Sequence, residues 1–144
     1  MSFTQKYRDQ HDELVQLVLQ VSPLLTVAKV DEKCQEIATI MSTLTGKLKM
    51  HLAVEDQFLY PALQKVVNPN VQKKANDFAN EMGTITTAYL EYRQKWGLPT
   101  QIKANPNEFI KETQAVFKVL KTRIDKENGE LYKLADEFHV QKAS

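Results

Sequence analysis

Apolar residues recur every three or four positions along most of the 144-residue chain, and this spacing limits the fold more than any other feature. Such a repeat places apolar side chains on one face of an α-helix, whereas a half-buried strand needs strict alternation, which no stretch sustains. Turn-forming residues divide the pattern into four helical segments, expected near residues 4–28, 31–66, 70–97 and 105–138. Amphipathic helices joined by short turns predict one all-α domain over residues 1–144, an antiparallel up-down-up-down four-helix bundle.

Proline, glycine and asparagine mark the expected boundaries between these segments. The stretches "NPN" at 68–70 and "GLP" at 97–99 are typical of turns. Asn105 is expected to cap a helix whose first residue is Pro106. Pro23 should end or kink the first helix, and Asp31 is the expected cap of the second.

Composition and charge exclude several classes of function. A net charge of +1 gives no field that would attract nucleic acid. No apolar run approaches the roughly 20 residues that span a membrane, and the first residues are too polar for a secretory signal. Cys34 is the only cysteine, so an intrachain disulfide or a cysteine-based zinc site cannot form. These features favour a cytoplasmic location.

Four polar residues interrupt the apolar stripes: His11, His51, Glu55 and Glu127. His51 and Glu55 are four positions apart, so their side chains lie on one face of a helix about one turn from each other. A histidine and a carboxylate beside a core are suited to binding a metal ion. The alternative is a buried, hydrogen-bonded pair with a structural role.

The sequence contains a weak internal repeat that pairs these residues. "HLAVEDQFLYPAL" aligns without gaps to "RIDKENGELYKLA" at an offset of 72 (123 − 51 = 72). In this alignment Glu55 falls on Glu127, while His51 falls on Arg123. At an offset of 71 (82 − 11 = 71), His11 falls on Met82. Glutamate therefore meets glutamate, and each histidine meets another residue type.

These residues resemble the hemerythrin-like family of HHE cation-binding domains over nearly the whole chain. The resemblance implies a four-helix bundle that holds two irons in its core. The family pattern has a histidine in the first helix and His-x3-Glu followed by Leu-Tyr/Phe-Pro in the second. It has one or more histidines in the third helix, and His-x3-Glu or a close variant in the fourth. It is matched by His11, by His51 with Glu55 and "LYP" at 59–61, and by Glu127 with "LY" at 131–132. The resemblance implies that Glu55 and Glu127 are the carboxylates that bridge the metals.

The chain departs from the family pattern at two ligand positions. Met82 and Arg123 stand where histidines are expected, and neither thioether nor guanidinium suits an iron site. Glu81 is a candidate replacement ligand, whereas His139 lies 12 residues beyond Glu127 (139 − 127 = 12) and does not restore the site. We therefore expect at most one bound metal and no normal di-iron site. If Arg123 points inward, it should form an ion pair with Glu127 or Glu55.

Three functions remain open at this point. The first is a metal protein with a reduced site, with iron as the implied cofactor, that senses or handles oxygen, nitric oxide or iron. Its partner would be a small diatomic ligand or the metal ion itself. The second is a metal-free bundle that acts as an interaction or regulatory module. The third is a haem protein that uses a histidine and Met82 as axial ligands. The sequence shows no arrangement of a nucleophile with a base, so we do not expect an enzyme.

Overall fold

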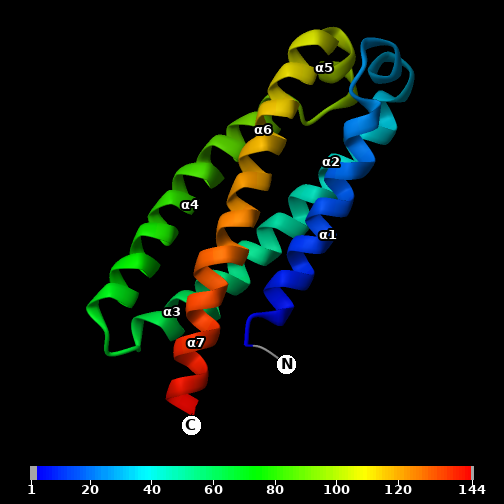
Figure 1. Cartoon of the computed structure of the whole chain (residues 1–144). Helices are drawn as coiled ribbons and strands as arrows, with labels where there is room; N and C mark the ends of the chain where they lie inside the picture. Colours follow the sequence, from blue (N-terminus) through cyan, green and yellow to red (C-terminus); the bar gives the residue numbers. More distant parts are fainter. Residues whose placement is uncertain (1–2, 144) are drawn as a thin grey trace.

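The computed structural model describes residues 3–143, with side chains to residue 138, and contains no strand within that range. The long helices are α1 (Gln5–Val21), α2 (Val27–Val54), α4 (Pro69–Lys95) and α6 (Pro106–Lys126). Figure 1 shows them lying alongside one another. α2 packs against α1 and α6, and α4 packs against α6. The prediction of an all-helical domain is confirmed.

Two of the helical runs continue beyond a π-helical turn. α2 passes through a π-turn at Glu55–Leu59 into α3 (Tyr60–Gln64). α6 passes through a π-turn at Glu127–Leu131 into α7 (Tyr132–Ala143). The two turns begin at the two glutamates that the internal repeat aligns, at the same offset of 72 (127 − 55 = 72). The repeat is therefore also present in the backbone.

The junction between the first two long helices differs from the sequence-based expectation. α1 ends at Val21 and is followed by a 3-10 turn at Ser22–Leu24, as Pro23 predicts. The second helix begins at Val27, and the hydroxyl of Thr26 accepts the backbone N–H of Lys29 at 3.3 Å. The prediction that Asp31 caps this helix is wrong, because the extended backbone of Thr26 already supplies the cap.

A short helix, α5 (Pro99–Ala104), was not expected from the sequence. It follows the predicted turn at Gly97, and Pro99 occupies its first position. Ile102 of α5 is fully buried in the core, and α5 packs against α2. The helix covers one end of the structure, beside the α1–α2 connection (Figure 1). A stretch of six residues is too short to show a clear apolar period.

The buried core consists of two apolar clusters with a polar layer between them. In α1, Tyr7 belongs to one cluster and Leu14 to the other, with buried His11 between them. The order is reversed along the second run, where Leu48, in the same cluster as Leu14, precedes the polar residues and Leu59, in the same cluster as Tyr7, follows them. The polar layer contains the buried side chains His11, His51, Glu55, Arg123 and Glu127.

The π-turns change which side chains face the core. A π-turn contains one extra residue, and here the backbone N–H groups of Tyr60 and Tyr132 bond to the carbonyls of Glu55 and Glu127, five positions earlier. Tyr60 is consequently buried at 7% exposure. Phe58 is 49% exposed, although the apolar spacing of a regular α-helix would place it on the buried face.

Two Asn-Pro pairs begin helices, and they provide a test of helix capping. The side chain of Asn68 accepts the N–H groups of Asn70 and Val71 at 3.0 and 3.4 Å. Asn105 precedes α6 as predicted, but its side chain makes no capping bond and donates to Glu108 instead. We expect Asn68→Ala to lower the free energy of unfolding by about 1 kcal/mol. Asn105→Ala, the matched control, should lower it by clearly less in the same urea denaturation measurements. Equal losses would contradict this assignment of the caps.

Candidate metal centre

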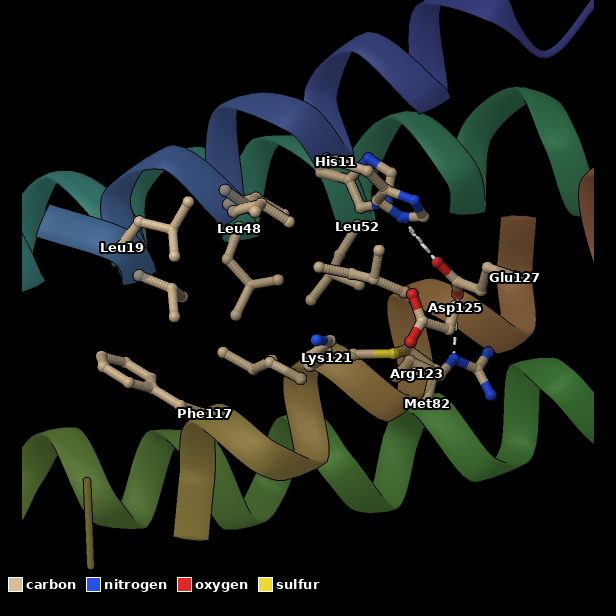
Figure 2. A pocket seen from close by; sticks show the side chains of 16 residues that line it. His11, Leu19, Leu48, Leu52, Met82, Phe117, Lys121, Arg123, Asp125 and Glu127 are labelled. Carbon is tan, nitrogen blue, oxygen red and sulfur yellow. Dashed lines mark hydrogen bonds and ion pairs between the residues drawn. The ribbon is translucent and has the colours of Figure 1, made fainter. Parts of the chain in front are cut away.

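Two histidines and a glutamate converge in the polar layer from three helical runs. His11 Nε2 lies 3.1 Å from His51 Nε2 and 2.9 Å from Glu127 Oε1. His51 Nε2 lies 3.8 Å from the same glutamate oxygen. These three side chains form a group that is able to hold a metal ion, and all three are buried. Figure 2 shows His11 facing Glu127, with Arg123 on the opposite side of the carboxylate.

The other nitrogen of each imidazole ring is held by an amide side chain. His11 Nδ1 lies 2.9 Å from the amide oxygen of Asn128, and His51 Nδ1 lies 2.7 Å from that of Gln10. A ring that donates its Nδ1–H to such an oxygen keeps the Nε2 lone pair free. In that tautomer two Nε2 lone pairs and an anionic oxygen face one another, an arrangement that a proton on Nε2 relieves in the metal-free protein and that a metal ion would relieve when bound. Metal-binding histidines are oriented by partners of this kind.

Burial also favours the neutral, ligating form of His51. It lowers the pKa of His51, because the charged imidazolium loses its hydration in the protein interior. The nearby Glu127 carboxylate acts in the opposite direction, and burial outweighs it. A neutral imidazole is the form that binds a metal ion.

Glu55 lies beside this group with one oxygen unused. Its Oε2 accepts a hydrogen bond from the Tyr132 hydroxyl at 2.7 Å. Its Oε1 finds no hydrogen-bond partner among the described residues, although it lies 3.3 Å from His51 Nε2. Burial, with a smaller effect of the Glu127 charge, raises the pKa of Glu55 well above its usual range. An unpaired, buried carboxylate oxygen beside two imidazoles fits a site for a cation.

Glu127 is the ionised carboxylate of the layer. Burial by itself would raise its pKa, but hydrogen bonds from His11 and His51 and the charge of Arg123 outweigh burial and lower the pKa to about 2. The carboxylate is divided between two partners: Oε1 faces His11, and Oε2 accepts from Arg123 Nε at 2.9 Å. The pKa values of Glu55 and Glu127, which the repeat aligns, are therefore shifted in opposite directions.

Arg123 points into the core, as the prediction of an ion pair requires. It is 4% exposed and pairs with Glu127, the first of the two predicted partners. Its Nη2 donates to the backbone carbonyl of Phe78 at 2.8 Å and contacts the Tyr60 hydroxyl at 3.4 Å. The guanidinium also lies 4.7 Å from the centre of the Phe78 ring. The ion pair predicted from the sequence is confirmed.

The donor set does not fit a second metal. The guanidinium of Arg123 fills the position that the repeat pairs with His51, and Met82 offers only a thioether. Glu81 does not join the group, because its half-exposed carboxylate lies 3.0 Å from Lys126 Nζ and 3.5 Å from Arg123 Nη1. The side chain of His139 lies outside the described residues. One cation fits this layer, and a pair of irons does not.

Three residues of the site were missed by the sequence reasoning. Gln10 and Asn128 orient the histidines, and Tyr132 places its hydroxyl in the centre of the group. The repeat had aligned Tyr132 with Tyr60, which was a usable signal. However, a residue five positions beyond Glu127 does not share its face in a regular helix. The π-turn brings Tyr132 inward, and no feature of the sequence predicted this turn.

An apolar pocket of about 230 Å³ reaches the candidate metal-binding group. His11, His51, Glu127 and Met82 are among the residues that line it. Leucine, valine, isoleucine and phenylalanine side chains from α1, α2 and α6 form most of the remaining wall (Figure 2). The pocket gives a small, uncharged molecule a water-poor place beside the two imidazoles.

A comparison with known protein families identifies the family of the chain. The family model described as the hemerythrin HHE cation-binding domain matches residues 2–135. The chain therefore belongs to the hemerythrin HHE cation-binding domain family. No curated protein and no solved structure matches the chain significantly. No helix among the described residues has the length and apolar character needed to cross a membrane.

The buried ion pair makes Arg123 a sensitive position for stability. Arg123→Ala leaves the Glu127 charge buried without its guanidinium, which should cost about 3–5 kcal/mol in the metal-free protein. Lys126→Ala is the matched control, because Lys126 pairs with Glu81 at the surface, where a pair contributes about 0–1 kcal/mol. Both values are measured by chemical denaturation in the presence of a chelator.

A double variant distinguishes two causes of the expected loss of stability: the uncompensated charge of Glu127 and the lost packing of the Arg123 side chain. Glu127→Gln in the Arg123→Ala background removes the uncompensated carboxylate and should recover part of the loss. If Arg123→Ala is no more destabilising than Lys126→Ala, the ion pair does not stabilise the layer.

Proposed function

We propose that this protein binds one metal ion through His11, His51 and Glu127. The observation that carries the proposal is the convergence of two Nε2 atoms and a carboxylate oxygen, each backed by a partner that fixes its orientation. Glu55 is close enough to contribute its unpaired oxygen. Iron is the metal suggested by the family, and the mixed nitrogen and oxygen donors suit it.

We further propose that the bound metal senses or handles a small diatomic ligand such as oxygen or nitric oxide. The apolar pocket supports this role, because an uncharged molecule enters such a cavity more easily than water does. A molecule in the pocket would lie beside His11, His51 and Glu127, which are part of its lining. We also propose that the four long helices run up and down in antiparallel order.

A cytoplasmic location and the absence of catalysis stay predictions from the sequence.

A metal-free module that binds another protein is the second candidate. Arg123 favours it, because the guanidinium already compensates the Glu127 charge without any metal. In this form the polar layer would be a hydrogen-bonded cluster whose role is to fix the packing of the helices. The two candidates differ in metal content, which can be measured directly on the purified protein.

The metal proposal predicts one ion per chain. Apo protein titrated with iron(II) under anaerobic conditions, or with zinc, should saturate at one equivalent by elemental analysis and calorimetry. His11→Ala and His51→Ala each remove a nitrogen donor and should abolish this binding. Glu81→Gln is the control and should leave the affinity unchanged, since Glu81 lies outside the group.

Arg123→His is expected to strengthen metal binding, whereas His11→Ala and His51→Ala are expected to abolish it. It removes the guanidinium from the position of the second metal and restores a His-x3-Glu pair with Glu127. We expect stronger metal binding or more than one equivalent bound. Two metals per chain in the unaltered protein would contradict the proposal, and so would unchanged binding in His51→Ala.

The diatomic-ligand role predicts that the pocket controls access to the site. Nitric oxide added to the iron(II)-loaded protein should give a new paramagnetic signal in electron paramagnetic resonance. Leu48→Phe narrows the pocket and should slow the appearance of this signal. Val119→Phe enlarges a side chain that does not line the pocket and should not change the rate. The role is contradicted if the loaded protein gives no signal.

A further inference from the structure

The hydroxyl of Tyr132 lies among the proposed metal ligands and contacts all of them. It is 3.0 Å from His11 Nε2, 3.3 Å from His51 Nε2 and 3.3 Å from Glu127 Oε1. The side chain is fully buried. Its ring stacks on Tyr7 at 5.6 Å and on His11 at 5.1 Å between ring centres, so its position is fixed by packing on both sides.

The four atoms have the spacing of a tetrahedral coordination shell. Their six separations run from 2.9 to 3.8 Å, and five of them lie between 2.9 and 3.3 Å. Four points with nearly equal separations form a tetrahedron. Ligands at about 2.0–2.1 Å from a central metal lie about 3.3–3.4 Å from one another in that geometry. A metal at the centre would therefore reach all four atoms with small adjustments.

Hydrogen bonding alone explains this arrangement poorly. The Tyr132 hydroxyl has one proton, and its shortest contact is the donation to Glu55 Oε2 at 2.7 Å. The phenol has no second proton for the two Nε2 atoms or for Glu127 Oε1, although all lie within 3.3 Å of its oxygen. When both imidazoles carry their proton on Nδ1, the phenol oxygen presents its lone pairs to a place where three other lone-pair donors converge.

We infer that Tyr132 is the fourth ligand of the metal ion, in a tetrahedral site with His11, His51 and Glu127. The inference rests on the proposed metal-binding function and adds an anionic oxygen to its donor set. On binding, the phenol O–H bond breaks and a metal–oxygen bond forms. The proton passes to Glu55 Oε2, its hydrogen-bond acceptor, and no electron is transferred.

The internal repeat supplies a matched control for this role. Tyr60 is aligned with Tyr132 and is also buried after a π-turn. Its hydroxyl lies 3.4 Å from Arg123 Nη2. The two tyrosines are therefore equivalent in sequence context and burial, while only Tyr132 contacts the two histidines and both glutamates.

The test uses ferric iron, because a phenolate bound to iron(III) gives an intense visible charge-transfer band. One equivalent of ferric nitrilotriacetate is added to the apo forms of the unaltered protein, Tyr132→Phe and Tyr60→Phe. Visible absorption and resonance Raman spectra are recorded, and bound iron is measured by elemental analysis. Zinc affinity of the same three proteins is measured by chelator competition, and circular dichroism verifies folding.

We expect the unaltered protein and Tyr60→Phe to become coloured and to show tyrosinate vibrations. Tyr132→Phe should lose both signals and bind zinc at least about tenfold more weakly. If iron binds at one equivalent without the band and Tyr132→Phe keeps full zinc affinity, the inference is wrong while the metal-binding function stands. A band that disappears in Tyr60→Phe instead would also overturn it. If neither metal binds, both fail.

Discussion

The structure depends on a single buried carboxylate, that of Glu127, which is shared between a guanidinium and two imidazoles. A carboxylate removed from water is strongly destabilising unless charged or hydrogen-bonding groups surround it. Here Arg123 binds one oxygen at 2.9 Å and His11 lies 2.9 Å from the other. The helices that carry these residues must therefore meet at one level. The polar layer fixes how α1, α2 and α6 are positioned along one another.

The two halves of the repeat have the same backbone conformation, a π-turn that begins at a glutamate, but different side chains around that glutamate. Both π-turns begin at a glutamate and end before a tyrosine, so Glu55 resembles Glu127 and Tyr60 resembles Tyr132. The residue four positions before each glutamate differs: it is His51 in one half and Arg123 in the other. The hydrogen bonds of His11 and His51, together with the charge of Arg123, outweigh burial and lower the pKa of Glu127, and the guanidinium also contacts the Tyr60 hydroxyl. Tyr132 is left to face the histidines.

The sequence was sufficient for the fold class and for most of the site. Apolar spacing predicted the helices, and the positions of His11, His51, Glu55 and Glu127 within apolar stripes indicated that they would be buried together. The ion pair of Arg123 with Glu127 was predicted from their spacing on one helix, on the condition that Arg123 points inward. The extra helix α5 and the cap at Thr26 were missed, because both depend on short segments without a repeating pattern. Tyr132 was missed because the π-turns shift the helical register, and no residue type marks such a turn.

Under the proposed function, the charges of the polar layer favour one bound cation over two. With Glu127 paired to Arg123, the layer still holds Glu55, whose pKa is raised by burial and by Glu127, and a tyrosine hydroxyl that donates to it. The oxygens of Glu55 and Tyr132 would balance the positive charge of a single divalent or trivalent ion. His11 and His51 would bind the same ion through their imidazole nitrogens. A second ion would have to displace the guanidinium, whose positive charge repels it and whose partners include Phe78 and Tyr60. Under the proposed function, the guanidinium of Arg123 therefore leaves a site for one metal ion, with His11, His51 and Glu127 as its ligands.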